Sequence, residues 1–129
     1  MTLRILAVDD DPVNRTLIRA SIARSRDPTL AGARLSEAGS IREARSKLAE
    51  EPADILLLDV HLPDGLGFEL AAELREGSAP PSILALTASV LPDEQRAAME
   101  AGCDAFLAKP YLPRALVEAI RSLVAQRER

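Results

Sequence analysis

Four consecutive aliphatic residues, Ile55–Leu58, lie in the middle of the chain and are followed directly by Asp59. A short run that is apolar at every position is typical of a central parallel strand covered on both faces. Ile83–Leu86 is a second run of this kind. Because parallel strands need a long crossover between them, which is usually a helix, the two runs predict an α/β fold.

The rest of the chain alternates between such runs and longer amphipathic segments. This alternation predicts a single (βα)5 doubly wound domain with helices on both faces of a parallel sheet. The second strand is the most polar and suits an edge, which gives the flavodoxin-like strand order 2-1-3-4-5. The expected strands are Leu3–Val8, Ala33–Ala38, Ile55–Leu58, Ile83–Leu86 and Ala105–Leu107, and the expected helices are Pro12 to about Arg24, one from about Ile41, Gly65 to Glu76, Pro92 to Ala101 and about Leu112 to Gln126.

Local signals mark several helix ends. Asp11 followed by proline is typical of an N-cap with proline at the first helical position. Ser40 and Glu43 have the spacing of a capping box. Gly102 is well placed to be the residue that follows the C-terminus of a helix, where glycine is favoured. The segment 26–32 contains an Asp-Pro pair and a glycine, and we expect it to be a loop.

Composition excludes several classes of protein. The 129 residues, 47% hydrophobic and 28% charged, indicate one soluble globular domain, with a core from about residue 3 to 125 and no output domain in this chain. The net charge is -4, and the charged residues form no block along the chain, so we expect no direct nucleic-acid binding. The apolar runs are too short to cross a membrane, and the single cysteine excludes an internal disulfide. We expect a cytoplasmic location.

Polar residues follow the strand ends. Asp9 and Asp10 follow the first strand, Asp59 the third, Thr87 the fourth, and Lys109, one of only two lysines, the fifth. In an open α/β sheet, ligands bind beyond these carboxyl ends, where the strand order reverses. Crowded carboxylates repel unless a cation neutralises them, and hard oxygen ligands suit Mg²⁺. Aspartate is an established covalent acceptor of phosphoryl groups, so the pattern indicates phosphoryl transfer.

Four segments, ILAVDDDPVNR, ILLLDVHLPDG, ALTAS and FLAKP, are spread over essentially the full length of the chain. In order and spacing they resemble the receiver domains of two-component response regulators. The resemblance implies the same (βα)5 fold with strand order 2-1-3-4-5. It also implies a histidine kinase or a histidine phosphotransfer protein as partner, and a switch rather than a turnover enzyme.

The resemblance further implies roles for single residues. Asp59 would be the phosphoacceptor and, with Asp10, a direct ligand of Mg²⁺, with Mn²⁺ as a possible substitute. Asp9 would help to hold the ion through water, and the backbone carbonyl of His61 would complete the protein ligands. We expect the His61 side chain to face solvent.

On the phosphate side, Thr87 and the amide of Ala88 would bind the phosphoryl oxygens, and Lys109 would pair with the phosphorylated aspartate. Phe106 occupies the place of the aromatic switch residue, which turns inward as Thr87 moves. The bond between Lys109 and Pro110 matches the family's usual cis peptide. The surface of the fourth helix, fifth strand and fifth helix would then change.

One departure from the family is visible. An aspartate often precedes the glycine of the loop after the acceptor, and here Leu66 precedes Gly67. That acid lies outside the reaction centre, so the departure concerns loop details only. Cys103 and Tyr111 are interpreted as packing residues.

The first helix has more apolar positions than one buried stripe needs. Val13 and Leu17 lie on one side, and Ile18 and Ile22 on another. One stripe must face the sheet. We hypothesise that the other docks against the helical bundle of a histidine kinase, without knowing which of the two is exposed.

Three other functions are less compatible with these residues. A flavodoxin-like FMN binder needs Ser, Thr and Gly after the first strand, where this chain has three aspartates. A phosphatase of the haloacid-dehalogenase type needs Asp-x-Asp at the nucleophile, whereas Asp59 is followed by Val60 and His61. A receiver-like scaffold that is never phosphorylated has little support from a complete set of reaction residues.

Overall fold

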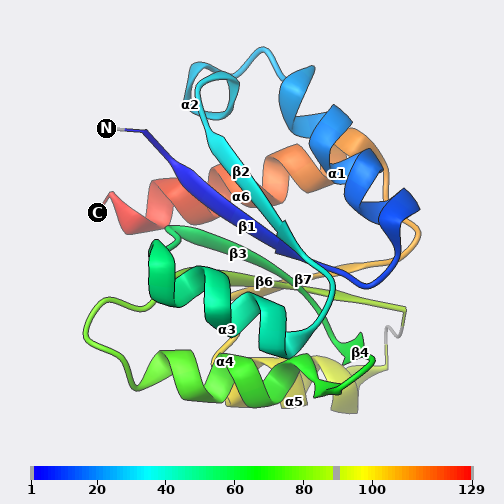
Figure 1. Ribbon diagram of the computed structural model, residues 1–129. Coiled ribbons are helices and arrows are strands. Elements are labelled where there is room, and N and C mark those ends of the chain that lie inside the picture. Colours follow the sequence, from blue (N-terminus) through cyan, green and yellow to red (C-terminus); the bar gives the residue numbers. More distant parts are fainter. Residues whose placement is uncertain (1, 89–90, 129) are drawn as a thin grey trace.

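The computed structural model describes residues 2–88 and 91–128. Five parallel strands form one sheet of order β2-β1-β3-β6-β7, shown in Figure 1. This is the order 2-1-3-4-5 predicted from the sequence. The strands are β1 (Arg4–Val8), β2 (Arg34–Ala38), β3 (Ile55–Asp59), β6 (Ser82–Thr87) and β7 (Ala105–Ala108).

Helices cover both faces of this sheet (Figure 1). One face packs against α1 and α6, and the other against α3, α4 and α5. The bounds of these helices are α1 Pro12–Ala23, α3 Ile41–Glu50, α4 Gly67–Arg75, α5 Pro92–Ala101 and α6 Pro113–Arg127.

Strand β3 shows why its sequence is apolar at every position. Ile55 and Leu57 point into the core under α1 and α6. Leu56 and Leu58 point into the core under α3, α4 and α5. All four are essentially inaccessible to solvent. The sheet is therefore buried on both sides, and Asp59 is carried to its carboxyl edge by a rigid strand.

The segment 26–32, expected to be a loop, contains a short helix, α2 (Pro28–Ala31). Asp27 caps it by accepting a hydrogen bond of 2.8 Å from the backbone N–H of Thr29. Leu30 is buried in the core beside α1 and α6. A single turn has only one apolar anchor, so it produces no periodic pattern, and the prediction of a loop was wrong.

The segment after β3 also differs from the prediction. Two short strands, β4 (His61–Leu62) and β5 (Gly65–Leu66), pair antiparallel. Gly65 has a φ of 148°, which a residue with a side chain rarely adopts. Helix α4 therefore begins at Gly67 and not at Gly65, because the turn consumes the two preceding residues.

The predicted helix caps are largely confirmed. Asp11 caps α1 by accepting from the backbone N–H of Val13 at 2.9 Å. Ser40 caps α3 by accepting from the N–H of Glu43 at 3.0 Å. The Glu43 carboxylate, however, accepts from Gly39 rather than from Ser40 as in a standard capping box.

Gly102 ends α5 in the left-handed conformation, with a φ of 114°. This confirms its predicted place after the helix C-terminus. Ser89, the last residue of the ALTAS segment, lies outside the described residues. Within residues 2–88 and 91–128, no helix has the length and apolarity that a membrane span requires.

Candidate functional site

The predicted site residues meet at the carboxyl edge of the sheet. Asp9 and Asp10 follow β1, Asp59 ends β3, Thr87 ends β6 and Lys109 follows β7. Because β1, β3 and β6 are neighbours in one parallel sheet, their ends are brought together although the residues are far apart in sequence. The strand order thus produces the site.

Three carboxylates form the acidic part of this site. Asp9, Asp10 and Asp59 each offer an oxygen, and these oxygens lie within 4.8 Å of one another. Asp9 is inaccessible to solvent and Asp59 is 8% exposed, whereas Asp10 is exposed. Hard oxygen ligands with one open side suit Mg²⁺, which keeps several waters. The donor set therefore fits a magnesium ion.

Lys109 connects two of these acids. Its Nζ lies 3.1 Å from Oδ2 of Asp9 and 3.3 Å from Oδ2 of Asp59. The backbone N–H of Lys109 donates to the carbonyl of Thr87 at 2.7 Å, which joins β7 to the end of β6. The following peptide bond to Pro110 is cis, as expected. Lys109 therefore faces the carboxylates from a fixed backbone position.

Asp9 is held on all sides. Its Oδ1 accepts from the backbone N–H of Asp11 at 2.9 Å, while its Oδ2 faces Lys109. Its own N–H donates to the carbonyl of Ala38 on β2 at 3.0 Å. Its carbonyl accepts from Nη1 of Arg15 at 2.7 Å. Both carboxylate oxygens of Asp9 therefore already have protein partners.

The electrostatics of the pocket follow from burial. Burial raises the pKa of Asp59, and the nearby charge of Asp9 raises it further, against the opposing effect of Lys109. Burial acts to lower the pKa of Lys109, but its hydrogen bonds to the two acids and their charges outweigh that effect and raise it. Lys109 therefore keeps its proton, whereas ionisation of the Asp59 carboxylate costs free energy.

A glycine that our sequence reasoning did not place in the site lies against the acceptor. A Cβ on Gly67 would come 2.4 Å from the backbone oxygen of Asp59 and 3.0 Å from the side chain of Leu58. The N–H of Gly67 also donates to the carbonyl of Val60 at 2.7 Å. Helix α4 can start this close to the acceptor only with glycine at its first position.

Asp64 was also missed. Its two carboxylate oxygens accept from the backbone N–H groups of Ile41 and Arg42, both at 2.9 Å, at the start of α3. These bonds lower the pKa of Asp64. They attach the hairpin that carries His61 to a helix N-terminus, where a carboxylate is favourable. Only these bonds to residues far away in the sequence show the role of Asp64, because in the sequence alone it is indistinguishable from an ordinary turn residue.

The remaining predicted residues lie as follows. The side chain of His61 is exposed, as expected, and Ala88 is exposed just beyond β6. Phe106 is half-buried on β7 and packs on the core beneath α3, α4 and α5. Cys103 is buried in that core, which confirms it as a packing residue, and burial raises the pKa of its thiol to about 12. Tyr111 packs on the core of the opposite face.

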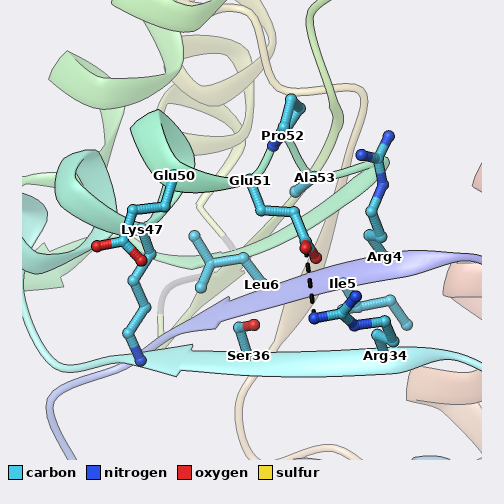
Figure 2. A pocket seen from close by; sticks show the side chains of 10 residues that line it. All are labelled: Arg4, Ile5, Leu6, Arg34, Ser36, Lys47, Glu50, Glu51, Pro52 and Ala53. Carbon is cyan, nitrogen blue, oxygen red and sulfur yellow. Dashed lines mark ion pairs between the residues drawn. The ribbon is translucent and has the colours of Figure 1, made fainter.

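A cavity of about 190 Å³ lies away from these residues, near the amino ends of β1 and β2 (Figure 2). The side chains around it are charged but largely paired. Arg34 lies 3.3 Å from Glu51, and Arg4 lies 3.3 Å from Asp54. Lys47 donates to a backbone carbonyl of β2. Both arginines thus have a carboxylate partner, so the cavity does not resemble a reaction centre.

A groove of about 400 Å³ opens beside the acidic pocket. Asn14, Leu17 and Ser21 of α1 form one wall, and the segment from Lys109 to Pro113 forms the other. Leu17 is 56% exposed and Val13 65%, whereas Ile18 and Ile22 are buried. The outer stripe of α1 is therefore the one that contains Val13 and Leu17.

Comparison with known families agrees with this geometry. The family model described as the response regulator receiver domain matches residues 5–121. The chain belongs to this family. Response regulator receiver domains are the phosphoacceptors and signalling switches of two-component systems.

Curated relatives include the transcriptional regulatory protein AruR of Pseudomonas aeruginosa. It is 33% identical, over 96% of this chain and 50% of AruR. An uncharacterized 14.6 kDa protein of Leptolyngbya boryana is 36% identical, over 91% of this chain and 86% of the relative. The chain spans about half the length of several curated relatives that it matches.

Solved structures show the same fold. The chemotaxis response regulator CheY4 of Vibrio cholerae superposes with a TM-score of 0.83 at 27% identity, over 95% of this chain and 99% of CheY4. A two-component response regulator of the LuxR family from Aurantimonas sp. SI85-9A1 has a TM-score of 0.84 at 32% identity, over 98% and 87% of the two chains.

Proposed function

We propose that this receiver domain accepts a phosphoryl group on Asp59 from a phosphohistidine donor, either a histidine kinase or a histidine phosphotransfer protein. One observation carries the proposal. The ammonium of Lys109 lies 3.3 Å from the carboxylate of Asp59, and carboxylate oxygens of Asp59 and Asp10 lie within 4.8 Å of each other. A carboxylate nucleophile between a cation and a metal-binding acid has the groups that phosphoryl transfer uses.

Transfer of the phosphoryl group from phosphohistidine to Asp59 involves no change of oxidation state. A carboxylate oxygen of Asp59 attacks the phosphorus, and a P–O bond forms as the P–N bond of the phosphohistidine breaks. The histidine nitrogen leaves with the electron pair and takes up a proton from solvent. Water later hydrolyses the acyl phosphate, which releases inorganic phosphate and restores the carboxylate, so the phosphorylated state is transient.

The other residues of the site have separate roles in this proposal. Asp10, Asp59 and the backbone carbonyl of His61 would hold Mg²⁺ directly, and Asp9 would hold it through water. When bound, the ion supplies charge neutralisation for the phosphoryl oxygens. Lys109 neutralises a further oxygen from the other side.

Thr87 and the amide of Ala88 would bind the remaining phosphoryl oxygens. Thr87 is buried at the end of β6, and Ala88 is exposed at the mouth of the site. A hydroxyl and an N–H at a strand end can donate without a change of charge. Their position at the end of β6, the strand next to the one that ends in Asp59, supports this assignment.

We infer that phosphorylation changes the surface formed by α5, β7 and α6. The dianionic group would draw Thr87 and Lys109 toward it, and Phe106 would turn inward. The half-buried position of Phe106 supports this inference, because its two rotamers then differ mainly in how much apolar surface they bury. The switch would be a shift between two populated states.

The donor would dock on the outer stripe of α1. Val13 and Leu17 are large apolar side chains on the surface of α1, and Leu17 lines the groove that leads to Lys109. Isolated apolar residues on a surface need no explanation, but a stripe next to a reaction centre indicates a contact. This assigns the docking hypothesis to Val13 and Leu17 rather than to the buried Ile18 and Ile22.

Intact mass after incubation with acetyl phosphate and Mg²⁺ tests the acceptor. We expect a gain of one phosphoryl group in the unmodified chain and none in the Asp59→Asn variant or in EDTA. Asp11→Asn is the matched control, because asparagine also caps helices and Asp11 adjoins the acid pair without belonging to the site. Labelling of Asp59→Asn would contradict the proposal.

Absence of labelling in the unmodified chain needs a second probe. Beryllofluoride mimics the acyl phosphate without a transfer step. Chemical-shift changes at Thr87 and Lys109 on adding beryllofluoride with Mg²⁺ would keep the acceptor assignment and point to a strict requirement for a protein donor. No change would favour an unphosphorylated scaffold.

A further inference from the structure

The turn between β2 and α3, residues 38–42, is bonded to the first of the two segments that would carry Mg²⁺ ligands. The carbonyl of Ala38 accepts a hydrogen bond of 3.0 Å from the backbone N–H of Asp9, and Asp10 follows directly. This bond extends the ladder between β1 and β2 by one residue beyond the end of β1. The segment that carries Asp10 is therefore fixed relative to the β2–α3 turn.

Asp64 attaches the second segment, the β4–β5 hairpin, to the other end of the same turn. Its two carboxylate oxygens accept from the backbone N–H groups of Ile41 and Arg42, both at 2.9 Å. These N–H groups lie in the first turn of α3, where the helix itself supplies no acceptor and its dipole favours a negative charge. The two bonds lower the pKa of Asp64, so its carboxylate is ionised at neutral pH.

The hairpin also packs closely on the start of α3. A Cβ on Gly65 would lie 3.2 Å from Cδ1 of Ile41, whose side chain is buried in the core. This contact is closer than most side chains tolerate. The attachment of the hairpin to α3 therefore consists of van der Waals contact as well as hydrogen bonds.

The base of the hairpin is held by the sheet. The N–H of Val60 donates to the carbonyl of Leu86 on β6 at 3.1 Å, and the N–H of Gly67 donates to the carbonyl of Val60 at 2.7 Å. His61 lies between this base and Asp64, and its exposed side chain contributes no burial that could hold it. The backbone of His61 is thus positioned from two ends, by the sheet and by the β2–α3 turn.

We propose that Asp64 is a positioning residue for Mg²⁺, which joins the hairpin to the β2–α3 turn and so sets the distance between the carbonyl of His61 and the carboxylate of Asp10. This inference rests on the proposed function, in which both groups hold the ion. The acidic cluster consists of Asp9, Asp10 and Asp59, so Asp64 acts on the ion through the hairpin. Mg²⁺ demands near-ideal octahedral geometry, which makes its affinity sensitive to the position of each ligand.

The experiment separates the attachment of the hairpin from the stability of α3. Asp64→Ala removes both acceptor oxygens, whereas Asp64→Asn retains one of them. Ser40→Ala is the matched control, because Ser40 also accepts from a backbone N–H at the start of α3, but from Glu43 of the same helix. For each chain we would measure urea unfolding, Mg²⁺ affinity by isothermal titration, and amide hydrogen exchange of β4 and β5 in EDTA.

We expect Ser40→Ala and Asp64→Ala both to lower the midpoint of urea unfolding, since each leaves N–H groups of α3 without a protein acceptor. Only Asp64→Ala should speed amide exchange in β4 and β5. Its dissociation constant for Mg²⁺ should rise at least about tenfold, as is usual when a residue that orients metal ligands is lost. Asp64→Asn should recover most of this affinity, and Ser40→Ala should bind Mg²⁺ as the unmodified chain does.

The rate of labelling by acetyl phosphate gives a further readout. Labelling of Asp64→Ala should be slow at low Mg²⁺ and should reach the rate of the unmodified chain when Mg²⁺ is saturating, because the substitution leaves Asp59 and Lys109 in place. A rate that stays low at saturation would overturn the positioning role, since the defect would then lie in the transfer step.

Two further results would overturn the inference and leave the proposed function intact. One is an Mg²⁺ affinity of Asp64→Ala equal to that of Ser40→Ala, and the other is unchanged amide exchange in β4 and β5. A different result would overturn the proposed function itself, and this inference with it. In that case the unmodified chain would neither bind Mg²⁺ nor be labelled, and the beryllofluoride probe would be silent.

Discussion

The guanidinium of Arg15 donates a 2.7 Å hydrogen bond to the backbone carbonyl of Asp9, the residue that follows β1 in the acidic pocket. Nε of the same guanidinium lies 3.3 Å from Glu37 on β2. Arg15 therefore holds the turn that carries Asp9 and Asp10 against the neighbouring strand, without touching the pocket itself.

Replacement of Arg15 by glutamine should weaken Mg²⁺ binding several-fold while the chain stays folded, because the turn loses a charge-assisted hydrogen bond worth about 1.5–3 kcal/mol. Isothermal titration with Mg²⁺ measures this directly. Arg19→Gln is the control, because Arg19 also pairs with Glu37 but does not reach Asp9. Equal effects of both variants would show that the loss of Glu37 pairing, and not the bond to Asp9, is responsible.

Replacement of Lys109 by glutamine should destabilise the chain by about 3 kcal/mol at neutral pH in EDTA, because the buried Asp9 loses its only ionic partner in the described structure. Urea unfolding gives the value. The other lysine, Lys47, supplies the control, since it donates only to a backbone carbonyl and Lys47→Gln should cost about 1 kcal/mol. Added Mg²⁺ should recover part of the Lys109→Gln deficit. A smaller loss of stability in Lys109→Gln than in Lys47→Gln would contradict the role of Lys109 as the partner of the buried Asp9.

Replacement of Gly67 by alanine should cost about 2 kcal/mol or more, because the new methyl group meets the backbone oxygen of Asp59 at 2.4 Å and α4 must move away. Thermal unfolding and the rate of labelling by acetyl phosphate should both fall. Gly32→Ala is the matched change, since a Cβ there meets nothing within 4 Å. It should alter stability by less than about 0.5 kcal/mol. If the two variants unfold alike, the close approach of α4 does not restrict residue 67.

The raised pKa of Asp59 has a consequence for stability, with burial as its main cause. The folded state binds the Asp59 proton more tightly than the unfolded state, so this group lowers the free energy of unfolding as pH rises through the window above the unfolded value. Asp59→Asn should therefore be more stable than the unmodified chain at pH 7 in EDTA. The difference should vanish below the pKa of an unfolded aspartate, about 3.9. Urea titrations from pH 3 to 7 would contradict this if the gap were constant.

Replacement of Leu17 by glutamate should leave the free energy of unfolding within about 0.5 kcal/mol, because this side chain is 56% exposed. Replacement of Ile22 by glutamate should cost more than about 4 kcal/mol, since it buries a charge in the core under α1. Only Leu17→Glu can then report on docking, and we expect it to slow transfer from a donor protein but not labelling by acetyl phosphate. Equal labelling and equal transfer would remove α1 from the docking surface.

The fold was largely predictable because a strand buried on both faces has a simple sequence pattern, a short run that is apolar at every position. Ile55–Leu58 has no polar position, and the structure buries each of its residues in one core or the other. The polar β2, predicted at the edge, indeed pairs with β1 alone. Helix α2 and the β4–β5 hairpin escaped prediction because elements of two to four residues carry too few apolar positions to show a period.

The candidate site was predictable to the extent that it lies at strand ends. Asp9, Asp59 and Lys109 converge because β1, β3 and β7 share one parallel sheet, and strand order can be inferred from polarity. The residues that hold the turns around the site were missed for a different reason. Arg15 and Asp64 act through backbone groups on other elements, and such contacts leave no pattern along the chain.

The edge of the sheet at β2 has a consequence for association of the chain in solution. Arg34 pairs across to Glu51 at the end of α3, and Glu37 pairs with Arg15 and Arg19 of α1. These side chains are charged, and their ion pairs hold them beside the unpaired hydrogen-bonding groups of the edge strand. Charged edges resist the addition of a strand from another molecule. Loss of the ion pairs should therefore promote aggregation through β2.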